Sequence, residues 1–338
     1  MSSTSDNCKD GASKSNDDGV CELEEKLQNI MVDTDVVVSV CANCGKEGDN
    51  INNICNKCKM VMYCNAACKK KHEKKHKKDC EEHRRRAAEL HDIELFKQPP
   101  PQEEDCPICF LLLPSLESGR GYKSCCGKVI CNGCVYAPLY DNQGNEVDNE
   151  KCPFCRVPTP SSDVEAVERV QKRIEKDDPI AMHSTGCYYS EGEYGHPQDY
   201  KKALELFNQA GELGCALAYN SIGVAYFKGR GEGVNVDKKK SIHYLELAAM
   251  KGDMMARHNL GCSEGICHYF DRALKHYMIA VKCGYTKSLN QIKKLYTSGH
   301  ATKDDYTEAL QSYQTYLGEI KSRQRDEAAA FSEEFRYY

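Results

Sequence analysis

Residues 41–80 have the sequence CANCGKEGDNINNICNKCKMVMYCNAACKKKHEKKHKKDC, in which cysteine and histidine recur at short intervals. Two C-x-x-C pairs come first, and two pairs with three intervening residues follow. A C-x-x-C turn directs two sulfur atoms at one metal ion, and residues i and i+4 share one face of a helix. The eight candidate ligands, enough for two tetrahedral zinc ions, are Cys41, Cys44, Cys55, Cys58, Cys64, Cys68, His76 and Cys80.

A second cysteine-rich stretch, residues 106–155, begins with CPIC, continues through CCGKVICNGC and ends with CPFC. It supplies eight further candidate ligands, which are Cys106, Cys109, Cys125, Cys126, Cys131, Cys134, Cys152 and Cys155. Zinc prefers thiolate and imidazole ligands in sets of four. The two stretches together therefore predict four zinc ions, two in each.

The whole chain has 22 cysteines among 338 residues, which indicates either disulfides or bound metal. Disulfides require an oxidising compartment, but the N-terminal sequence is polar and has no apolar segment like that of a signal peptide. We also find no stretch of about 18 apolar residues that would predict a membrane span. We therefore expect reduced, zinc-bound thiols in a cytoplasmic or nuclear protein.

The net charge of −5 argues against nucleic acid as a partner of the whole protein. One segment, Lys69–Arg86, differs, because it contains ten basic and four acidic residues. Such a segment can be a nuclear-import or nucleic-acid-binding patch. The alternative, which we favour, is a solvated face of a helix belonging to the first cysteine stretch.

The first stretch resembles the MYND zinc finger, and the aromatic Tyr63 directly before Cys64 matches that family as well. The resemblance implies interleaved ligand sets, with one zinc ion on Cys41, Cys44, Cys64 and Cys68 and the other on Cys55, Cys58, His76 and Cys80. Spacing alone leaves this interleaving open. It also leaves His72 as an alternative ligand, because His72 lies four residues from both Cys68 and His76. The resemblance favours His76, and it implies peptide partners, often containing proline.

The second stretch resembles the RING finger. The resemblance implies one zinc ion on Cys106, Cys109, Cys131 and Cys134 and a second on Cys125, Cys126, Cys152 and Cys155. Many RING fingers have a histidine at the place of Lys128, whose ammonium group cannot bind zinc. The adjacent Cys125 and Cys126 can compensate, as in the all-cysteine RING variant. The alternative is that one of these two cysteines is idle and the second site is incomplete.

RING fingers often act as ubiquitin ligases, which hold a ubiquitin-charged conjugating enzyme in a reactive pose without forming a covalent intermediate. By resemblance, Ile108 and Pro153 would contact the conjugating enzyme and Arg156 would bridge the enzyme and ubiquitin. Arginine suits that role because its planar fork donates several hydrogen bonds. The alternative is that Ile108 and Pro153 only shape their turns and that Arg156 is a solvated charge. The chain also has no tryptophan, which many active RING fingers place in the docking groove.

From Pro179 onward the sequence repeats. Gly186, Gly223 and Gly261 recur at steps of 37 and 38 residues, and alanines and further glycines recur at fixed places between them. A repeat length in the thirties with helical spacing predicts an α-solenoid of helix pairs, whose concave face typically binds proteins. The pattern resembles the Sel-one-like repeat. Between Gly261 and Asp271 the glycine-rich loop of the repeat is missing, which predicts a short first helix or a tight turn.

We therefore expect a mainly α protein, an α-solenoid of helix-pair repeats preceded by two small zinc-bound finger modules with cross-braced ligands. The predicted divisions are a lead segment over 1–37, a MYND-type finger with a trailing helix over 38–97, a proline-rich linker over 98–105, a RING-type finger over 106–158, a connecting helix over 159–178, the solenoid over 179–318 and a charged tail over 319–338. We expect a short helix over 20–32 and a tail that is helical at first and frayed at its end.

Three functions are compatible with these modules. The first is a zinc-dependent ubiquitin ligase, whose partners are a ubiquitin-conjugating enzyme, ubiquitin, and protein substrates or peptides bound by the MYND-type finger and the solenoid. The second is a non-catalytic scaffold in which both fingers only bind proteins. The third and weakest is a nuclear factor that uses Lys69–Arg86 on nucleic acid. We expect no membrane partner.

Overall fold

A computed structural model of the chain describes residues 40–48, 51–97, 105–115, 117–139, 147, 151–229 and 234–337. The chain divides into two compact units, residues 1–97 and 98–338, which are described separately below. The predicted helix over 20–32 and the proline run of the linker lie outside the described residues. Within the described part of the chain, no helix is both long and apolar enough to cross a membrane.

The first unit contains the first cysteine module, residues 40–96. Its strands β1 (Asn53–Ile54) and β2 (Met62–Tyr63) pair antiparallel and are followed by the 31-residue helix α1 (Ala66–Phe96). The Asn65 side chain caps α1 by accepting a hydrogen bond from the Cys68 N–H at 2.8 Å. The expected trailing helix is therefore part of one continuous helix that begins inside the metal-binding stretch.

The second unit begins with the second cysteine module, residues 105–158. Strands β3 (Arg120–Lys123) and β4 (Lys128–Cys131) form an antiparallel hairpin in which Lys123 lies opposite Lys128. A short helix, α2 (Asn132–Tyr136), follows β4 directly, and short 3-10 turns cover Glu117–Gly119 and Ala137–Leu139. The hairpin thus joins a tip that contains Cys125 and Cys126 to a base that contains Cys131.

Helix α3 (Asp163–Ile174) connects this module to the repeats. The Ser162 hydroxyl caps it by accepting from the Glu165 N–H at 3.3 Å. The reciprocal bond of a capping box is displaced by one residue, because the Glu165 carboxylate accepts from the Ser161 N–H at 2.9 Å. A second bond from the Ser161 hydroxyl to that carboxylate, at 3.0 Å, favours the displaced arrangement.

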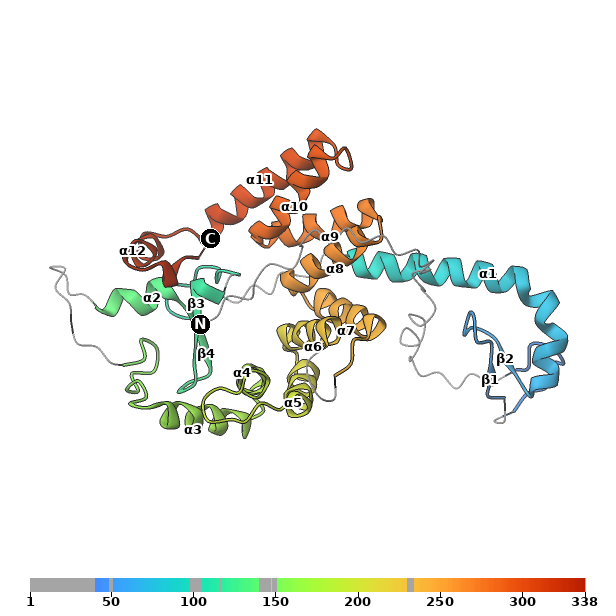
Figure 1. The fold of residues 1–338 in the computed structure, drawn as a ribbon, viewed down its shortest axis with the longest axis horizontal. Helices are drawn as coiled ribbons and strands as arrows, with labels where there is room; N and C mark the ends of the chain where they lie inside the picture. The colour runs from blue at the N-terminus through green and yellow to red at the C-terminus, as the bar shows by residue number, and fades with distance from the viewer. Residues whose placement is uncertain are drawn as a thin grey trace. The chain divides into compact units, whose positions relative to one another are not determined.

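The repeats form four antiparallel helix pairs (Figure 1). The pairs are α4 (Pro179–Glu191) with α5 (Tyr200–Glu212), α6 (Ala216–Lys228) with α7 (Lys238–Met250), α8 (Met254–Ile266) with α9 (Phe270–Lys282), and α10 (Thr286–Thr297) with α11 (Lys303–Ile320). Neighbouring pairs stack through α5 on α6, α7 on α8 and α9 on α10. The expected fold class, a mainly helical chain with helix-pair repeats after two cysteine-rich modules, is confirmed.

The recurring glycines lie where two helices of a pair touch. A Cβ atom on Gly186 would lie 2.5 Å from the ring of Phe207, and one on Gly261 would lie 2.5 Å from the ring of Tyr277. On Gly223 it would lie 2.8 Å from the Leu245 side chain. The first helix of each pair therefore needs glycine because the partner helix places a large side chain directly against its backbone.

The third repeat has the tight turn that its missing loop predicts. Helix α8 has 13 residues, the same number as α4 and α6, so the first helix of the pair is not shortened. Only residues 267–269 separate α8 from α9. His268 adopts a left-handed conformation there, with φ of 61°, which lets the chain reverse within three residues.

The C-terminal segment is helical at first, as expected, but its end is ordered instead of frayed. The chain forms helix α12 (Arg323–Phe331), followed by a 3-10 turn over Glu333–Phe335. Tyr337 is buried, and its hydroxyl donates to the Asp326 carboxylate. Helix α12 packs on α2 of the second cysteine module, from which it is separated by almost two hundred residues of sequence.

A paired substitution in α8 tests the role of the glycines. We expect Gly261→Ala to lower the unfolding free energy by about 1–3 kcal/mol, because its methyl group overlaps the Tyr277 ring. The control is Gly265→Ala in the same helix, where the nearest atom to a new Cβ is 4.0 Å away. That variant should match or slightly exceed the wild type. Urea unfolding followed by far-UV circular dichroism measures both, and equal midpoints would contradict the packing argument.

Candidate functional site

The sixteen predicted ligands lie together in four groups, within each of which all ligand atoms are within 4.8 Å of one another. The groups are Cys41, Cys44, Cys64 and Cys68; Cys55, Cys58, His76 and Cys80; Cys106, Cys109, Cys131 and Cys134; and Cys125, Cys126, Cys152 and Cys155. This grouping is the interleaved one that the two resemblances imply. Each group can hold one metal ion.

The distances within the groups fit zinc. Sulfur atoms about 2.3 Å from a tetrahedral zinc ion lie about 3.8 Å from one another. The Sγ atoms of Cys55 and Cys80 are 3.8 Å apart, and so are those of Cys109 and Cys131. The Cys58 Sγ lies 3.3 Å from His76 Nε2, a shorter edge, as expected where a nitrogen replaces a sulfur.

Four of the five C-x-x-C pairs form turns with the same backbone geometry, and the fifth, Cys131–Cys134, begins helix α2 instead. In each of the four, the residue after the second cysteine donates its N–H to the carbonyl of the first cysteine at 2.9–3.0 Å. That residue also has a positive φ of 56° to 72°, which favours glycine. The four residues are Gly45, Lys59, Phe110 and Arg156. Three of them accept a strained, left-handed conformation, which indicates that the metal-binding turn imposes it.

In the first module, His76 and not His72 joins a ligand group. His76 is buried beside Cys58, and burial lowers the pKa of its imidazole, which favours the neutral form that binds metal. His72 is half-buried, lies 3.2 Å from the Tyr63 hydroxyl through Nδ1, and stacks on the His76 ring. The alternative ligand is therefore a neighbour that orients the ligand histidine.

Backbone N–H groups favour thiolate at the first cysteine of a turn. Burial raises the pKa of the Cys41 thiol, but hydrogen bonds from the backbone at Cys64 and Cys44 outweigh it and bring the pKa to about 6. Burial also raises the pKa of the Cys152 thiol, but hydrogen bonds from the backbone at Cys155 and Phe154 outweigh it and bring the pKa to about 7. Such turns present a sulfur already prepared for metal coordination.

The adjacent cysteines of the second module both belong to one group. They lie at the tip of the β3–β4 hairpin, where Gly127 with φ of 71° reverses the chain. The Cys125 Sγ lies 3.4 Å from Cys155, and the Cys126 Sγ lies 3.9 Å from Cys152. Lys128 is exposed on β4 and is not part of the group. The geometry thus permits both cysteines to bind one ion.

The three predicted contact residues differ in exposure. Ile108 is half-buried and packs against the cysteine-rich core of the second module, and Pro153 is half-buried in the last C-x-x-C turn. Arg156 is exposed, and in the described part of the chain it forms no ion pair. Sequence reasoning missed two exposed aromatic residues in the same turns, Phe110 at 75% and Phe154 at 43% exposure. Their position is the sequence signal that could have identified them, because Phe154 lies inside a C-x-x-C pair and Phe110 directly follows one.

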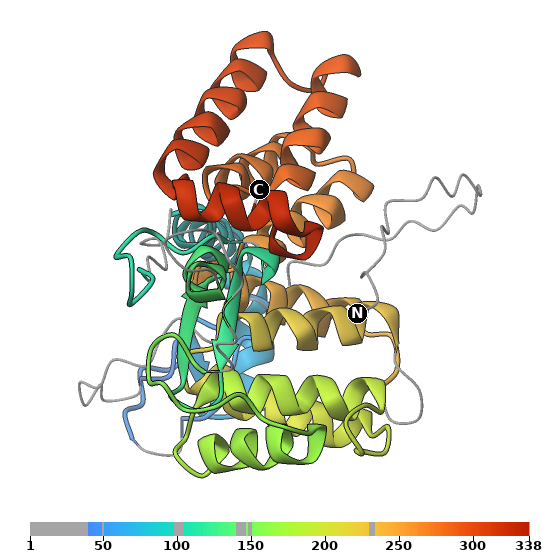
Figure 2. The ribbon, with the colours of Figure 1, turned by 90° about the vertical axis from the view of Figure 1, so that its left-hand side faces the viewer.

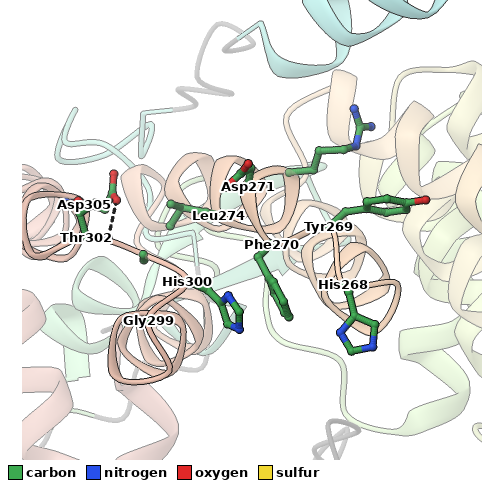
Figure 3. Close-up of a pocket in the computed structure, with 11 residues that line it drawn as sticks. His268, Tyr269, Phe270, Asp271, Leu274, Gly299, His300, Thr302 and Asp305 are labelled. Atoms are coloured by element: carbon green, nitrogen blue, oxygen red, sulfur yellow. Dashed lines mark hydrogen bonds between the residues drawn. The ribbon is translucent and has the colours of Figure 1, made fainter.

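The repeats contribute an open pocket of about 630 Å³ between the α8–α9 turn and the α10–α11 turn (Figure 3). In it the ring of Phe270 stacks on His300, with centroids 3.7 Å apart. Asp271 and Asp305 also line the pocket, and the Asp305 carboxylate accepts from the Thr302 N–H at 2.8 Å. This recess combines aromatic and acidic side chains on the outer turns of the repeats.

Comparison with protein families identifies two of the modules. The MYND finger model matches residues 41–80, and the Sel1 repeat model matches residues 179–215 and 216–253. A MYND finger binds zinc, which agrees with the two ligand groups of the first module. No model identifies the second cysteine module as a RING finger.

Curated relatives match short stretches. The E3 ubiquitin-protein ligase DA2 of Arabidopsis thaliana is 38% identical over 74 residues, which cover 22% of this chain and 17% of that protein. The E3 ubiquitin-protein ligase GW2 of Oryza sativa subsp. indica is 34% identical over 70 residues, which cover 21% of this chain and 15% of that protein. The ERAD-associated E3 ubiquitin-protein ligase component HRD3B of Arabidopsis thaliana is 35% identical over 95 residues, which cover 27% of this chain and 14% of that protein. The chain thus spans 14–17% of the length of these relatives.

Among solved structures, a Sel1 repeat protein from Oxalobacter formigenes is 27% identical, with a TM-score of 0.40 over 46% of this chain and 64% of that chain. A protective antigen from uropathogenic Escherichia coli is 24% identical, also with a TM-score of 0.40, over 52% of this chain and 38% of that chain.

Metal analysis of single variants tests the second module. Because Cys125 and Cys126 both lie in one ligand group, Cys125→Ala and Cys126→Ala should each reduce bound zinc from four ions to three per chain. Cys267→Ala is the control, since this exposed cysteine lies outside the groups. Plasma mass spectrometry of the purified full chain gives the count. A variant at either position that retains four ions would show that this cysteine is idle.

The two histidines of α1 allow a matched test of the first module. His76→Ala should remove one zinc ion, because only three ligands remain in its group. His72→Ala should retain four ions, since its Nδ1 lies against the Tyr63 hydroxyl and the residue belongs to no ligand group. The same metal measurement applies. Loss of zinc from the His72 variant alone would assign the ligand to His72.

Proposed function

We propose that the protein is a zinc-dependent, RING-type ubiquitin ligase that recruits protein substrates through its MYND finger and its helical repeats. In this proposal Ile108, Pro153 and Arg156 contact a conjugating enzyme and its ubiquitin. The observation that carries the proposal is the exposed Arg156 guanidinium, which has no ion-pair partner among the described residues although it follows a metal-binding turn. An exposed arginine with unoccupied donors is suited to bridging two protein surfaces.

The first and last C-x-x-C turns of the second module also supply an apolar surface. Phe110 and Phe154 are exposed beside the half-buried Ile108 and Pro153. Exposed aromatic side chains at a fixed position are typical of protein-binding surfaces. The partial similarity to ubiquitin ligases of Arabidopsis thaliana and Oryza sativa supports the same class of partner.

The activity would depend on positioning alone. The conjugating enzyme carries ubiquitin as a thioester, and the attacking amine comes from the substrate. In the proposed complex the apolar turns hold the enzyme, and the Arg156 guanidinium donates hydrogen bonds to both partners. This restricts the thioester to conformations that an amine can attack, which is catalysis by orientation. Zinc would have no part in bond making, because four protein ligands leave no open position on the ion.

A non-catalytic scaffold is the second candidate. It is favoured by the packing of Ile108 against the cysteine-rich core, which leaves only part of that side chain for a partner. In a scaffold, the MYND finger and the concave face of the repeats would bind proteins or peptides, and the second module would add a further binding surface.

The remaining expectations are proposals of the same kind. We place the protein in the cytoplasm or the nucleus, with four zinc ions, two in each cysteine module. We expect no nucleic-acid partner for the basic segment, since Arg85 on the exposed surface of α1 forms ion pairs of 2.6 Å with Glu82 and Glu89. Such pairing is typical of a solvated helix.

Autoubiquitination with a panel of conjugating enzymes tests the proposal. We expect wild-type activity with at least one enzyme and a loss of about tenfold or more in Ile108→Ala and Arg156→Asn, because both remove a contact to the enzyme. Asparagine is chosen at 156 because it tolerates a positive φ. Lys128→Ala, which removes another exposed basic side chain of the module, is the control.

Zinc content measured on the same samples separates loss of contact from loss of folding. Variants that retain four ions but lose activity support the ligase. A wild-type protein that is inactive with every conjugating enzyme, while fully loaded with zinc, would establish the scaffold instead.

A further inference from the structure

Arg325 in α12 is a buried charged residue with an unusual set of partners. Its side chain is 1% exposed. The guanidinium donates from Nη1 to the carbonyls of Leu112 at 2.8 Å and Ile320 at 2.6 Å. From Nη2 it donates to the carbonyl of Leu111 at 3.4 Å and to the Sγ of Cys109 at 3.8 Å. The arginine therefore reaches from the end of the chain into the first metal-binding turn of the second module.

None of the carboxylates in the described part of the chain pairs with Arg325. A buried guanidinium that keeps its charge without an opposite charge nearby is costly, because it has lost its hydration. Carbonyl dipoles satisfy some of its donors but provide no net negative charge. The sulfur of Cys109 belongs to a group of four thiols, completed by Cys106, Cys131 and Cys134. Four thiolates around one divalent ion carry a net charge of about −2.

The surrounding packing fixes Arg325 in this place. A Cβ atom on Gly133 would lie 2.8 Å from the Arg325 backbone nitrogen, so only glycine allows α12 to approach α2 this closely. The ring of Tyr136 packs on Phe331, with centroids 5.2 Å apart. Ahead of α12, the Tyr316 hydroxyl accepts a hydrogen bond from the Ser115 N–H at 2.8 Å. Helix α12 is thus held on the second module by contacts on both sides of the arginine.

We infer that Arg325 is a positioning residue that balances the charge of the metal group Cys106, Cys109, Cys131 and Cys134, so that residues 323–337 are an integral part of the second cysteine module. The guanidinium holds the Leu111 and Leu112 carbonyls, which fixes the turn that presents Ile108. Its positive charge stabilises thiolates in a buried, metal-bound site. A fragment ending at residue 178 would lack this group.

The test compares three full-chain variants loaded with zinc. Arg325→Met keeps much of the volume of the side chain and removes the charge, whereas Arg325→Lys keeps the charge and removes the fork. Arg323→Met is the control, since Arg323 is an exposed arginine of the same helix that pairs with Glu327 at 2.7 Å. Zinc release to a chromophoric chelator gives the rate and the number of ions.

We expect one of four ions to leave Arg325→Met on the order of 10–100 times faster than wild type, if the affinity loss typical of residues that support metal ligands appears in the release rate. Arg325→Lys should restore most of the difference, and Arg323→Met should match the wild type. Alkylation of released thiols, located by mass spectrometry, should modify Cys106, Cys109, Cys131 and Cys134 first.

Two results would overturn the inference. If Arg325→Met releases all ions at the wild-type rate, the charge is not needed at the site. If Arg325→Lys releases zinc as fast as Arg325→Met, the hydrogen-bonding fork and not the charge is responsible, and this comparison holds even where both variants fold less well. The readout does not use ubiquitin transfer, so its outcome is independent of whether the protein is a ligase.

Discussion

The cores of both cysteine modules consist largely of the candidate metal ligands themselves. The buried cluster of the first module contains Cys41, Cys55, Cys58 and Cys80, with only Ile51 and Tyr63 added. In the second module, four of the six buried residues of the cluster are cysteines as well, joined by Leu113 and Ile130. Without an ion, four thiols would face one another with little apolar contact to hold them. Structural zinc contributes about 10–16 kcal/mol in small finger peptides, which is enough to fold such a segment.

The second cysteine module contacts both ends of the helical repeats. At the first end, the Tyr122 hydroxyl donates to the Asp178 carboxylate at 2.7 Å, and Arg173 forms an ion pair with that carboxylate at 2.8 Å. Asp178 also caps α4. At the other end lies α12, so the β3–β4 hairpin extends between the two (Figure 2). The second cysteine module therefore contacts both the start of the first repeat and the C-terminal helix.

The sequence predicts local features well and long-range ones poorly, and the reason is physical. Ligand spacing and the recurring Gly186 both act within a few residues or within one helix pair, so a regular sequence pattern reveals them. The contact of Arg325 with Cys109 joins residues 216 positions apart and leaves no pattern in either segment. For that reason the sequence predicts a frayed end of the tail, whereas Tyr337 near that end is buried. The left-handed Phe110 was missed because the metal-binding turn, and not the preference of phenylalanine, determines its backbone.

Two arginines at the second cysteine module have the same side chain but different surroundings, which suit one to binding a partner protein and the other to holding a turn in place. Arg156 and Arg325 have the same guanidinium group, and both lie beside a C-x-x-C turn or its ligands. Arg156 is exposed, and it lies at the left-handed position that closes the last C-x-x-C turn. Arg325 is buried, and its two Nη groups donate to the Leu111 and Leu112 carbonyls and the Cys109 sulfur of one turn and to the Ile320 carbonyl of α11. If the proposed ligase surface is correct, the buried arginine maintains the turn that presents Ile108, and the exposed arginine acts on the partner that the turn positions.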